Sequence, residues 1–263
     1  MSSATGSGGL LELNISDGIA TVTLDDPDRR NILSAEISRE IVATVGALAE
    51  REDVAALVVT GRGRAFCAGA DLADLLAAGE GDLAEVQLVY DAFGGVADFP
   101  RPTIAAVNGP AVGAGLNLAL ACDVRLVGPR ARFDSRFLAI GIHPGGGHAW
   151  MLERLLGPQA AAAMLLFGET IGAADAVRLG LAWELCEDAS LLPRARELAA
   201  RVAGAPSHMV RDMKDTLRTT PHLTTRAEAL AVETVRQTES LTRSEAKDLI
   251  AALKSMISTD GPG

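Results

Sequence analysis

Apolar and polar positions follow a strand-like pattern near the start of the chain and a helical period soon after it. Residues 10–15 and 19–24 are β-rich runs separated by Asp17-Gly18, a dipeptide typical of a hairpin turn. Ser34 belongs to a residue type that caps helix N-termini, and apolar side chains at helical spacing follow it at Ile37, Ile41, Val45 and Leu48. This stretch therefore predicts a β-hairpin followed by an amphipathic helix.

Continuous apolar runs of strand length predict a sheet that is buried on both faces, as parallel sheets are. These runs are residues 54–60, 103–107 and 124–127, with shorter strands expected within 131–147 and at 182–186. A Gly/Ala-rich helix is expected from about Gly113, and residues 191–256 have the period of several amphipathic helices. We therefore expect a disordered tail at residues 1–9, an α/β core at 10–200 and a helical C-terminal region at 201–263.

Composition supports a folded protein and excludes some classes of binding partner. Hydrophobic residues make up 48 % of the 263 residues, which is enough for a packed core. The formal charge of −10 argues against a nucleic acid or an anionic membrane as partner, because both require basic residues. The three cysteines lie far apart, residues 1–9 show no signal-peptide pattern, and polar residues interrupt the apolar stretch at 103–128. We expect a cytoplasmic protein without membrane contact.

Several common motifs are incomplete or missing. Gly113-Ala114-Gly115 begins like a dinucleotide fingerprint, but the third glycine is replaced by Leu118. The sequence has no Walker A lysine motif, no HExxH and no GxSxG, so serine and zinc hydrolases have no support from motifs. His143 and His148 lie five positions apart without an evident third ligand, and no metal site is expected.

Two Gly-rich segments, residues 65–72 and 101–123, each follow a buried strand and carry most of the functional information. Small residues let a ligand approach the backbone closely, and free N–H groups at a helix start favour negative charge. Two such N–H groups pointing at one oxygen would form an oxyanion hole. The alternative interpretation of the two segments is that they form tight turns in a well-packed core and bind no ligand.

Both segments resemble the crotonase superfamily, which comprises the enoyl-CoA hydratases and isomerases. The resemblance extends to residues 27–33, 57–61, 140–147 and 173–181, and covers about residues 11–253. It implies an α/β fold of the crotonase type, a spiral of ββα units with a helical C-terminal extension. It also implies an acyl-CoA thioester as substrate, no cofactor other than its coenzyme A, and a homotrimer or dimer of trimers formed through the C-terminal helices.

The resemblance assigns the site residue by residue. The oxyanion amides fall on Ala70 and Ala114, the backbone near Ala68 meets the adenine, and Arg29 or Arg30 lies near the CoA phosphates. The remaining substrate-contacting positions are Asp71, Leu72, Gly113, Phe137 and Pro144. The alternative for Asp71 is that its side chain caps or hydrogen-bonds its own loop and does not contact the substrate. In the family a lysine often follows the Ala-Asp pair by two positions; here that position is Ala73, so the resemblance does not assign this phosphate contact.

The chain departs from the family at both catalytic glutamates. Their positions hold Asn117 and Phe137. Asn117 can orient a water or a carbonyl but cannot accept a proton near neutral pH, whereas Phe137 can only exclude water. His143 is the leading candidate for the proton carrier, with His148 and Asp134 as further candidates. The alternative for the histidines is packing beside a turn or capping the helix that starts near His148.

These observations leave two functions open. The first is an enzyme of the enoyl-CoA hydratase/isomerase type that stabilises a thioester enolate in a backbone oxyanion hole with an altered acid/base set. The second is a non-catalytic acyl-CoA-binding protein on the same scaffold. The related spiral-fold peptidases need a serine on the second oxyanion loop, and residues 113–117 contain none.

Overall fold

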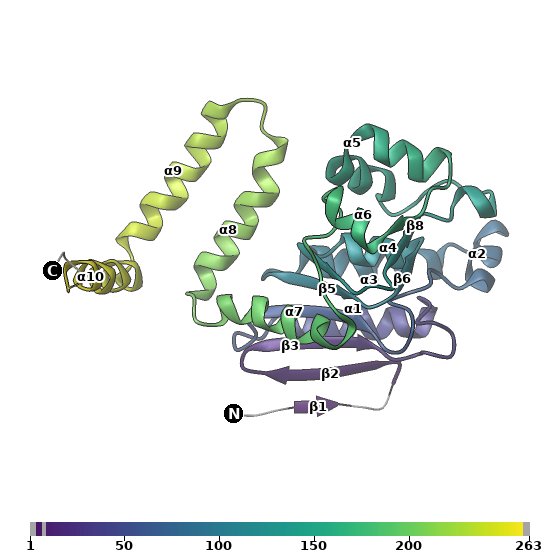
Figure 1. The fold of residues 1–263 in the computed structure, drawn as a ribbon, viewed down its shortest axis with the longest axis horizontal. Helices are drawn as coiled ribbons and strands as arrows, with labels where there is room; N and C mark the ends of the chain where they lie inside the picture. Colours follow the sequence, from purple (N-terminus) through teal and green to yellow (C-terminus); the bar gives the residue numbers. More distant parts are fainter. Residues whose placement is uncertain (1–3, 7–8, 260–263) are drawn as a thin grey trace. The chain divides into compact units, whose positions relative to one another are not determined.

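A seven-stranded sheet forms the centre of the larger part of the chain (Figure 1). The structure is a computed structural model that describes residues 4–6 and 9–259. In spatial order the strands are β1 (Ala4–Gly6), β2 (Leu11–Ser16), β3 (Ile19–Leu24), β4 (Ala56–Gly61), β5 (Thr103–Val107), β7 (Val124–Val127) and β10 (Glu184–Leu185). The first two pairings are antiparallel and the others are parallel. The predicted hairpin and the buried strands are therefore confirmed, although β10 is shorter than expected.

Both faces of this sheet are buried, because successive side chains of a strand point to opposite faces. In β4, Leu57 and Val59 pack in one apolar cluster with α1 (Ala35–Ala49) and α3 (Ala84–Asp98). Ala56 and Val58 pack in a second cluster with α7 (Asp188–Ala203) on the opposite face. The continuous apolar runs of the sequence follow from this two-sided burial.

Further helices and a second sheet lie between and after the parallel strands in the chain order. The helices are α2 (Leu72–Gly79), α4 (Ala114–Leu120), the 3₁₀ turn η1 (Leu138–Ile140), α5 (His148–Leu166) and α6 (Ala173–Arg178). The second sheet has the order β6 (Pro110–Val112), β8 (Arg132–Asp134) and β9 (Ile171–Gly172). In α5 the helix is interrupted at Gly157, whose φ of 74° and ψ of 171° are not helical, just before Pro158.

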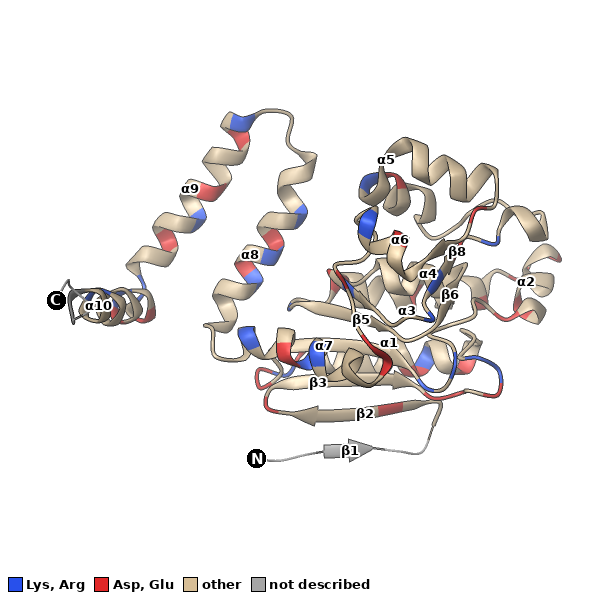
Figure 2. Ribbon diagram, viewed as in Figure 1, with Lys and Arg blue, Asp and Glu red and all other residues tan. Residues whose placement is uncertain are grey.

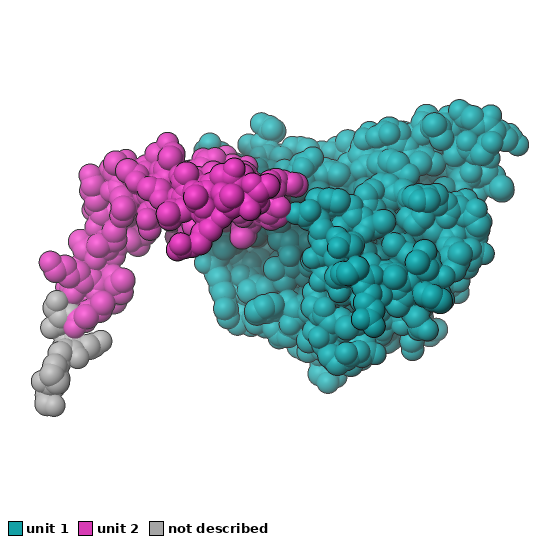
Figure 3. Space-filling view, turned by 90° about the horizontal axis from the view of Figure 1, so that it is seen from above, with its two compact units in different colours: residues 1–203 teal, residues 204–263 magenta. Residues whose placement is uncertain are grey.

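The chain divides into two compact units, Met1–Ala203 and Gly204–Gly263 (Figure 3). The expected boundary after residue 200 lies close to this division. The expected disordered tail differs from the structure in one segment, because Ala4–Gly6 pairs with β2. That pairing uses backbone groups of an edge strand and needs no apolar side chains, which is why the hydrophobic pattern did not show it. The other tail residues up to residue 8 lie outside the described part of the chain.

The second unit consists of helices, as expected. They are α8 (Ser207–Thr219), the 3₁₀ turn η2 (Thr220–His222), α9 (Arg226–Thr242) and α10 (Ser244–Thr259). The side chain of Thr225 accepts a hydrogen bond from Glu228 N, and the Glu228 carboxylate accepts one from Thr225 N, which closes a capping box at the start of α9. Acidic and basic residues are interspersed along α8 and α9 (Figure 2). Within the described residues, no helix is long and apolar enough to cross a membrane.

Candidate active site

A cavity of about 120 Å³ is lined by most of the residues that the sequence singled out. Its walls come from α2, α3, both Gly-rich segments and the loop around η1. The predicted site residues that line it are Ala68, Ala70, Leu72, Gly113, Ala114, Asn117, Phe137 and His143. Arg29, Arg30, Asp71 and Pro144 are not among the residues that line this cavity.

The two Gly-rich segments hold each other through their backbones. Cys67 N donates to Pro110 O at 3.1 Å, and Val112 N donates to Cys67 O at 3.0 Å. A Cβ atom on Gly115 would lie 2.2 Å from Cys67 O, so only glycine allows this approach. Gly69 has a φ of +111°, and a Cβ atom there would lie 3.0 Å from Val112 O. The glycines of both motifs are therefore required by the contact between the two segments.

Ala70 and Ala114 each bring a free backbone N–H to this cavity. Ala114 is the first residue of α4, so its amide has no acceptor within the helix. Neither amide donates a hydrogen bond to another group among the described residues. The cavity wall thus carries two unused donors, one from each Gly-rich segment.

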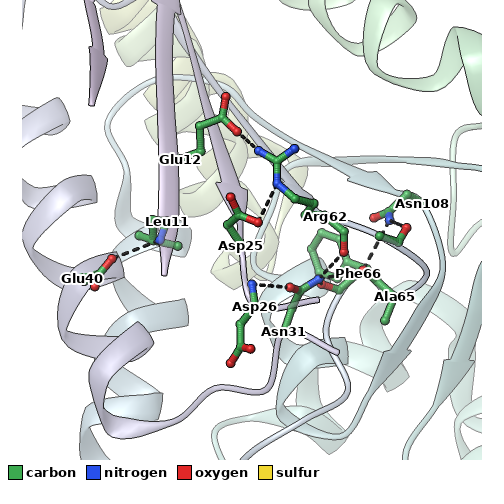
Figure 4. Close-up of polar contacts among 11 residues, drawn as sticks. Leu11, Glu12, Asp25, Asp26, Asn31, Glu40, Arg62, Ala65, Phe66 and Asn108 are labelled. Atoms are coloured by element: carbon green, nitrogen blue, oxygen red, sulfur yellow. Dashed lines mark hydrogen bonds and ion pairs between the residues drawn. The ribbon is translucent and has the colours of Figure 1, made fainter. Parts of the chain in front are cut away.

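Asn31 fixes the turn that precedes the first Gly-rich segment (Figure 4). Its side chain is fully buried, and Nδ2 donates to the carbonyl oxygens of Arg62, Ala65 and Phe66 at 3.0, 2.9 and 3.2 Å. Its Oδ1 accepts a hydrogen bond from Asp26 N at 2.9 Å. These bonds attach the turn before α1 to the segment after β4.

The turn also holds the cavity segment directly. Ala68 N donates to Arg30 O at 3.0 Å, and Leu33 N donates to Gly69 O at 2.7 Å. The Arg30 backbone therefore positions Ala68, the residue expected to meet the adenine.

The two predicted phosphate ligands have different surroundings. Arg29 pairs with Asp26 at 2.7 Å and lies 3.8 Å from Asp71. Arg30 lines a second cavity of about 540 Å³, whose other cationic residues are Arg64, Arg132 and Arg136. This cavity shares Ala68, Val112 and Arg136 with the first one.

Asp71 and Pro144 make local contacts. Asp71 is the N-cap of α2, and its Oδ1 accepts a hydrogen bond from Ala73 N at 2.9 Å. The carbonyl oxygen of Pro144 accepts a hydrogen bond from His143 Nδ1 at 2.8 Å. Nδ1 of His143 therefore carries the ring hydrogen, and Nε2 keeps a lone pair that can accept a proton. His143 is one of the residues that line the cavity.

The side chain of Asn117 makes hydrogen bonds to two other residues, which the sequence did not predict. Its Oδ1 lies 2.5 Å from His148 Nδ1, and its Nδ2 donates to Gly145 O at 3.1 Å. Nε2 of His148 lies 2.9 Å from Ser135 Oγ. The rings of Phe137 and His148 pack in an edge-to-face arrangement with their centroids 4.8 Å apart. Burial lowers the pKa of His148 from its ordinary value of 6.5 to about 4. Asn117 Nδ2 has two hydrogens and donates one to Gly145 O, which leaves the second on a residue that lines the cavity.

Two carboxylates of the cavity wall were not found from the sequence. Asp74 lies on α2 and Glu85 in the first turn of α3, and both line the cavity. Glu85 pairs with Arg39 at 2.8 Å, whereas Oδ2 of Asp74 has no hydrogen-bond partner among the described residues. Burial, and then the negative charges of Asp71 and Glu85, raise the pKa of Asp74. No motif identifies this pair, since the two residues meet only through the packing of α2 on α3.

The described part of the chain shows no metal centre, and the Cys67 thiol of the first Gly-rich segment is not ionised. No group of three or more His, Cys, Asp or Glu side chains there has an arrangement that could hold a metal ion. Burial raises the pKa of the Cys67 thiol to about 12, so Cys67 stays protonated beside the first segment.

Comparisons with known proteins identify the family of this chain. The family model for enoyl-CoA hydratase/isomerase matches residues 14–257. The chain is 52 % identical over 210 residues to the "probable enoyl-CoA hydratase EchA14" of Mycobacterium tuberculosis, covering 79 % of this chain and 81 % of that protein. It is 31 % identical over 199 residues to the 1,2-epoxyphenylacetyl-CoA isomerase of Escherichia coli, covering 74 % and 76 %. The crystal structure of enoyl-CoA hydratase from Bacillus anthracis matches with a TM-score of 0.88 and 26 % identity, covering 94 % and 96 %. The chain therefore belongs to the enoyl-CoA hydratase/isomerase family and has the crotonase fold.

Proposed function

We propose that the chain binds an enoyl-CoA thioester in the cavity and converts it through a thioester enolate. The observation that carries this proposal is the pair of unused N–H groups at Ala70 and Ala114 in one cavity wall. Two such donors hold the carbonyl oxygen and stabilise the charge that develops on it. The apolar side chains of Leu72, Val86 and Ile142 in the same wall suit an acyl chain.

The acid/base set of this proposal differs from that of the hydratases with two glutamates. Within the part of the chain that the structure describes, His143 Nε2 and Asp74 Oδ2 have no hydrogen-bond partner, and both residues line the cavity. Each can take or give a proton, whereas Asn117 and Phe137 cannot. Asn117 contributes one amide hydrogen that orients the substrate or a water.

Coenzyme A enters the proposal as part of the substrate, with no separate cofactor. The second cavity adjoins the first at Ala68 and is lined by Arg30 and Arg64, whose charges suit phosphate groups. The proposed self-association as a homotrimer or dimer of trimers rests on the second unit. Its helices carry exposed apolar side chains: Met213, Leu217, Leu230, Val235, Leu249, Ile250, Leu253 and Ile257.

Mass spectrometry of enoyl-CoAs incubated with stoichiometric protein tests the function, after calorimetry has shown which of them bind. A product one water heavier indicates hydration, and an isobaric product with a moved double bond indicates isomerisation. We expect His143→Ala to lose the product and His222→Ala, at an exposed histidine of the second unit, to retain it. Bound but unchanged substrate would instead identify a non-catalytic acyl-CoA-binding protein.

A further inference from the structure

Ser135, His148 and Asn117 form one chain of hydrogen bonds beside the proposed thioester site. Ser135 follows β8, His148 begins α5 and Asn117 lies in α4, so three separate elements supply them. Ser135 Oγ lies 2.9 Å from His148 Nε2, and His148 Nδ1 lies 2.5 Å from Asn117 Oδ1. The three residues are only 3, 1 and 1 % exposed, respectively. The order of the groups is that of a nucleophile, a base and a group that orients the base.

The hydrogen bond from Asn117 to Gly145 determines the donor and the acceptor in the other two hydrogen bonds. Asn117 Nδ2 donates to Gly145 O, so its Oδ1 is the acceptor and His148 Nδ1 must carry a hydrogen. The lowered pKa of His148 keeps the ring neutral near pH 7, which leaves a lone pair on Nε2. The Ser135 hydroxyl therefore donates to Nε2. This is the tautomer that a general base for a serine requires.

Ser135 lies beside the proposed oxyanion amide of Ala114. It lines the same cavity as Ala70 and Ala114. Gly113 N donates to Asp134 O at 2.9 Å, and a Cβ atom on Gly113 would lie 3.8 Å from Ser135 O. The serine thus sits next to the segment that would hold the thioester carbonyl. The arrangement differs from that of the spiral-fold peptidases, whose serine belongs to the oxyanion loop itself.

We propose that this protein also hydrolyses acyl-CoA thioesters through an acyl–Ser135 intermediate. The inference rests on the acyl-CoA substrate class proposed above. Ser135 Oγ attacks the thioester carbonyl carbon as its proton passes to His148 Nε2, and the amides of Ala70 and Ala114 hold the oxyanion. The C–S bond then breaks, and His148 returns the proton to the sulfur of the departing coenzyme A.

A water molecule completes the reaction. It attacks the acyl carbon of the Ser135 ester while His148 Nε2 takes its proton, the ester C–O bond breaks, and His148 returns the proton to Ser135 Oγ. The products are a carboxylic acid and free coenzyme A, and no oxidant or reductant is required. Asn117 holds the imidazole through both steps, and Phe137 shields one edge of the ring from water.

The test follows thiol release from short- and medium-chain acyl-CoAs with a thiol reagent, together with the intact mass of rapidly quenched protein. We expect free coenzyme A and a protein adduct of the acyl mass on a peptide containing Ser135. Ser135→Ala should lower thiol release at least about a hundredfold and abolish the adduct. The matched control Ser190→Ala, at an exposed serine of α7, should change neither.

Binding measurements separate failure of this inference from failure of the proposed function. Calorimetry should show that Ser135→Ala binds acyl-CoA as the wild type does, with an unchanged thermal melt. His148→Gln should retain binding and lose acylation, which a merely structural hydrogen-bond chain would not produce. Acyl-CoA binding by the wild type without thiol release or adduct would overturn the hydrolysis and leave the proposed function standing. Absence of any acyl-CoA binding would overturn both.

Discussion

The imidazole of His148 is hydrogen-bonded to the side chain of Asn117, with Nδ1 and Oδ1 2.5 Å apart. The resemblance to the crotonase superfamily implies a glutamate at the position of Asn117 in the hydratases. A glutamate would place a negative charge beside the ring, whereas asparagine offers a neutral acceptor. A neutral acceptor at Asn117 therefore fits a buried neutral histidine, and of the two residues Asn117 lines the cavity.

Stability should fall as acid approaches the pKa of His148. The folded state holds the neutral ring with a pKa of about 4, whereas the unfolded chain takes up a proton near 6.5. The unfolded state therefore binds more protons between these values, and the free energy of unfolding decreases as pH falls through this window. The decrease from this residue is at most about 3 kcal/mol. Urea unfolding at a series of pH values measures it.

The control for this prediction is His148→Gln, which keeps a hydrogen-bonding side chain but cannot titrate. The variant is expected to lose less stability than the wild type between about pH 6.5 and 4. Parallel stability curves for the two proteins would show that His148 is not the group responsible.

The sequence predicted the sheet well because burial on two faces leaves a strong pattern, as in Thr103–Val107. It also predicted the two Gly-rich segments, since glycines required by a close approach are visible as a motif. The carboxyl of Asp74 was missed because it reaches the cavity only through the packing of two helices. The Ser135–His148–Asn117 chain was missed for a similar reason: the last two lie 31 positions apart and meet only in the folded core.

Gly69→Ala should destabilise the fold and weaken acyl-CoA binding. The φ of +111° at Gly69 is strained for alanine, and the new Cβ atom would lie 3.0 Å from Val112 O. A cost of about 1–3 kcal/mol is expected, with displacement of the neighbouring Ala70 amide. Urea unfolding and calorimetry with an acyl-CoA measure the two effects.

Gly79→Ala is the matched control, because nothing lies within 4 Å of its added Cβ atom at the end of α2. It should stabilise the helix slightly, by at most about 1 kcal/mol. Equal effects of the two substitutions would contradict the role given to Gly69.

Arg30→Gln should weaken coenzyme A binding more than Arg29→Gln does. Arg30 lines the cationic second cavity, whereas Arg29 is already paired with Asp26 at 2.7 Å. Loss of a charged hydrogen bond to phosphate costs about 1.5–3 kcal/mol, which is about a tenfold to hundredfold change in Kd. Titration calorimetry with free coenzyme A at low and high salt measures the difference. The gap between the variants should narrow at high salt, and a larger loss in Arg29→Gln would reverse the assignment.

Asp74→Asn should separate activity from stability. The substitution keeps the shape of the side chain and removes a charge that burial, Asp71 and Glu85 all disfavour. If Asp74 moves a substrate proton, turnover should fall by about 10²–10⁴-fold. The unfolding free energy at pH 7 should stay equal or rise, because the repulsion is gone. Turnover of enoyl-CoA and urea unfolding are measured on the same preparations.

The stability difference between the wild type and Asp74→Asn should depend on pH. The pKa of Asp74 is raised in the folded state, so the folded protein binds more protons than the unfolded chain as the carboxyl titrates. The wild type should therefore gain stability relative to Asp74→Asn as pH falls through that range. The control Asp98→Asn, at the end of α3 and outside the residues that line the cavity, should leave turnover unchanged. Full turnover in Asp74→Asn would leave His143 as the proton carrier of the proposed enolate chemistry.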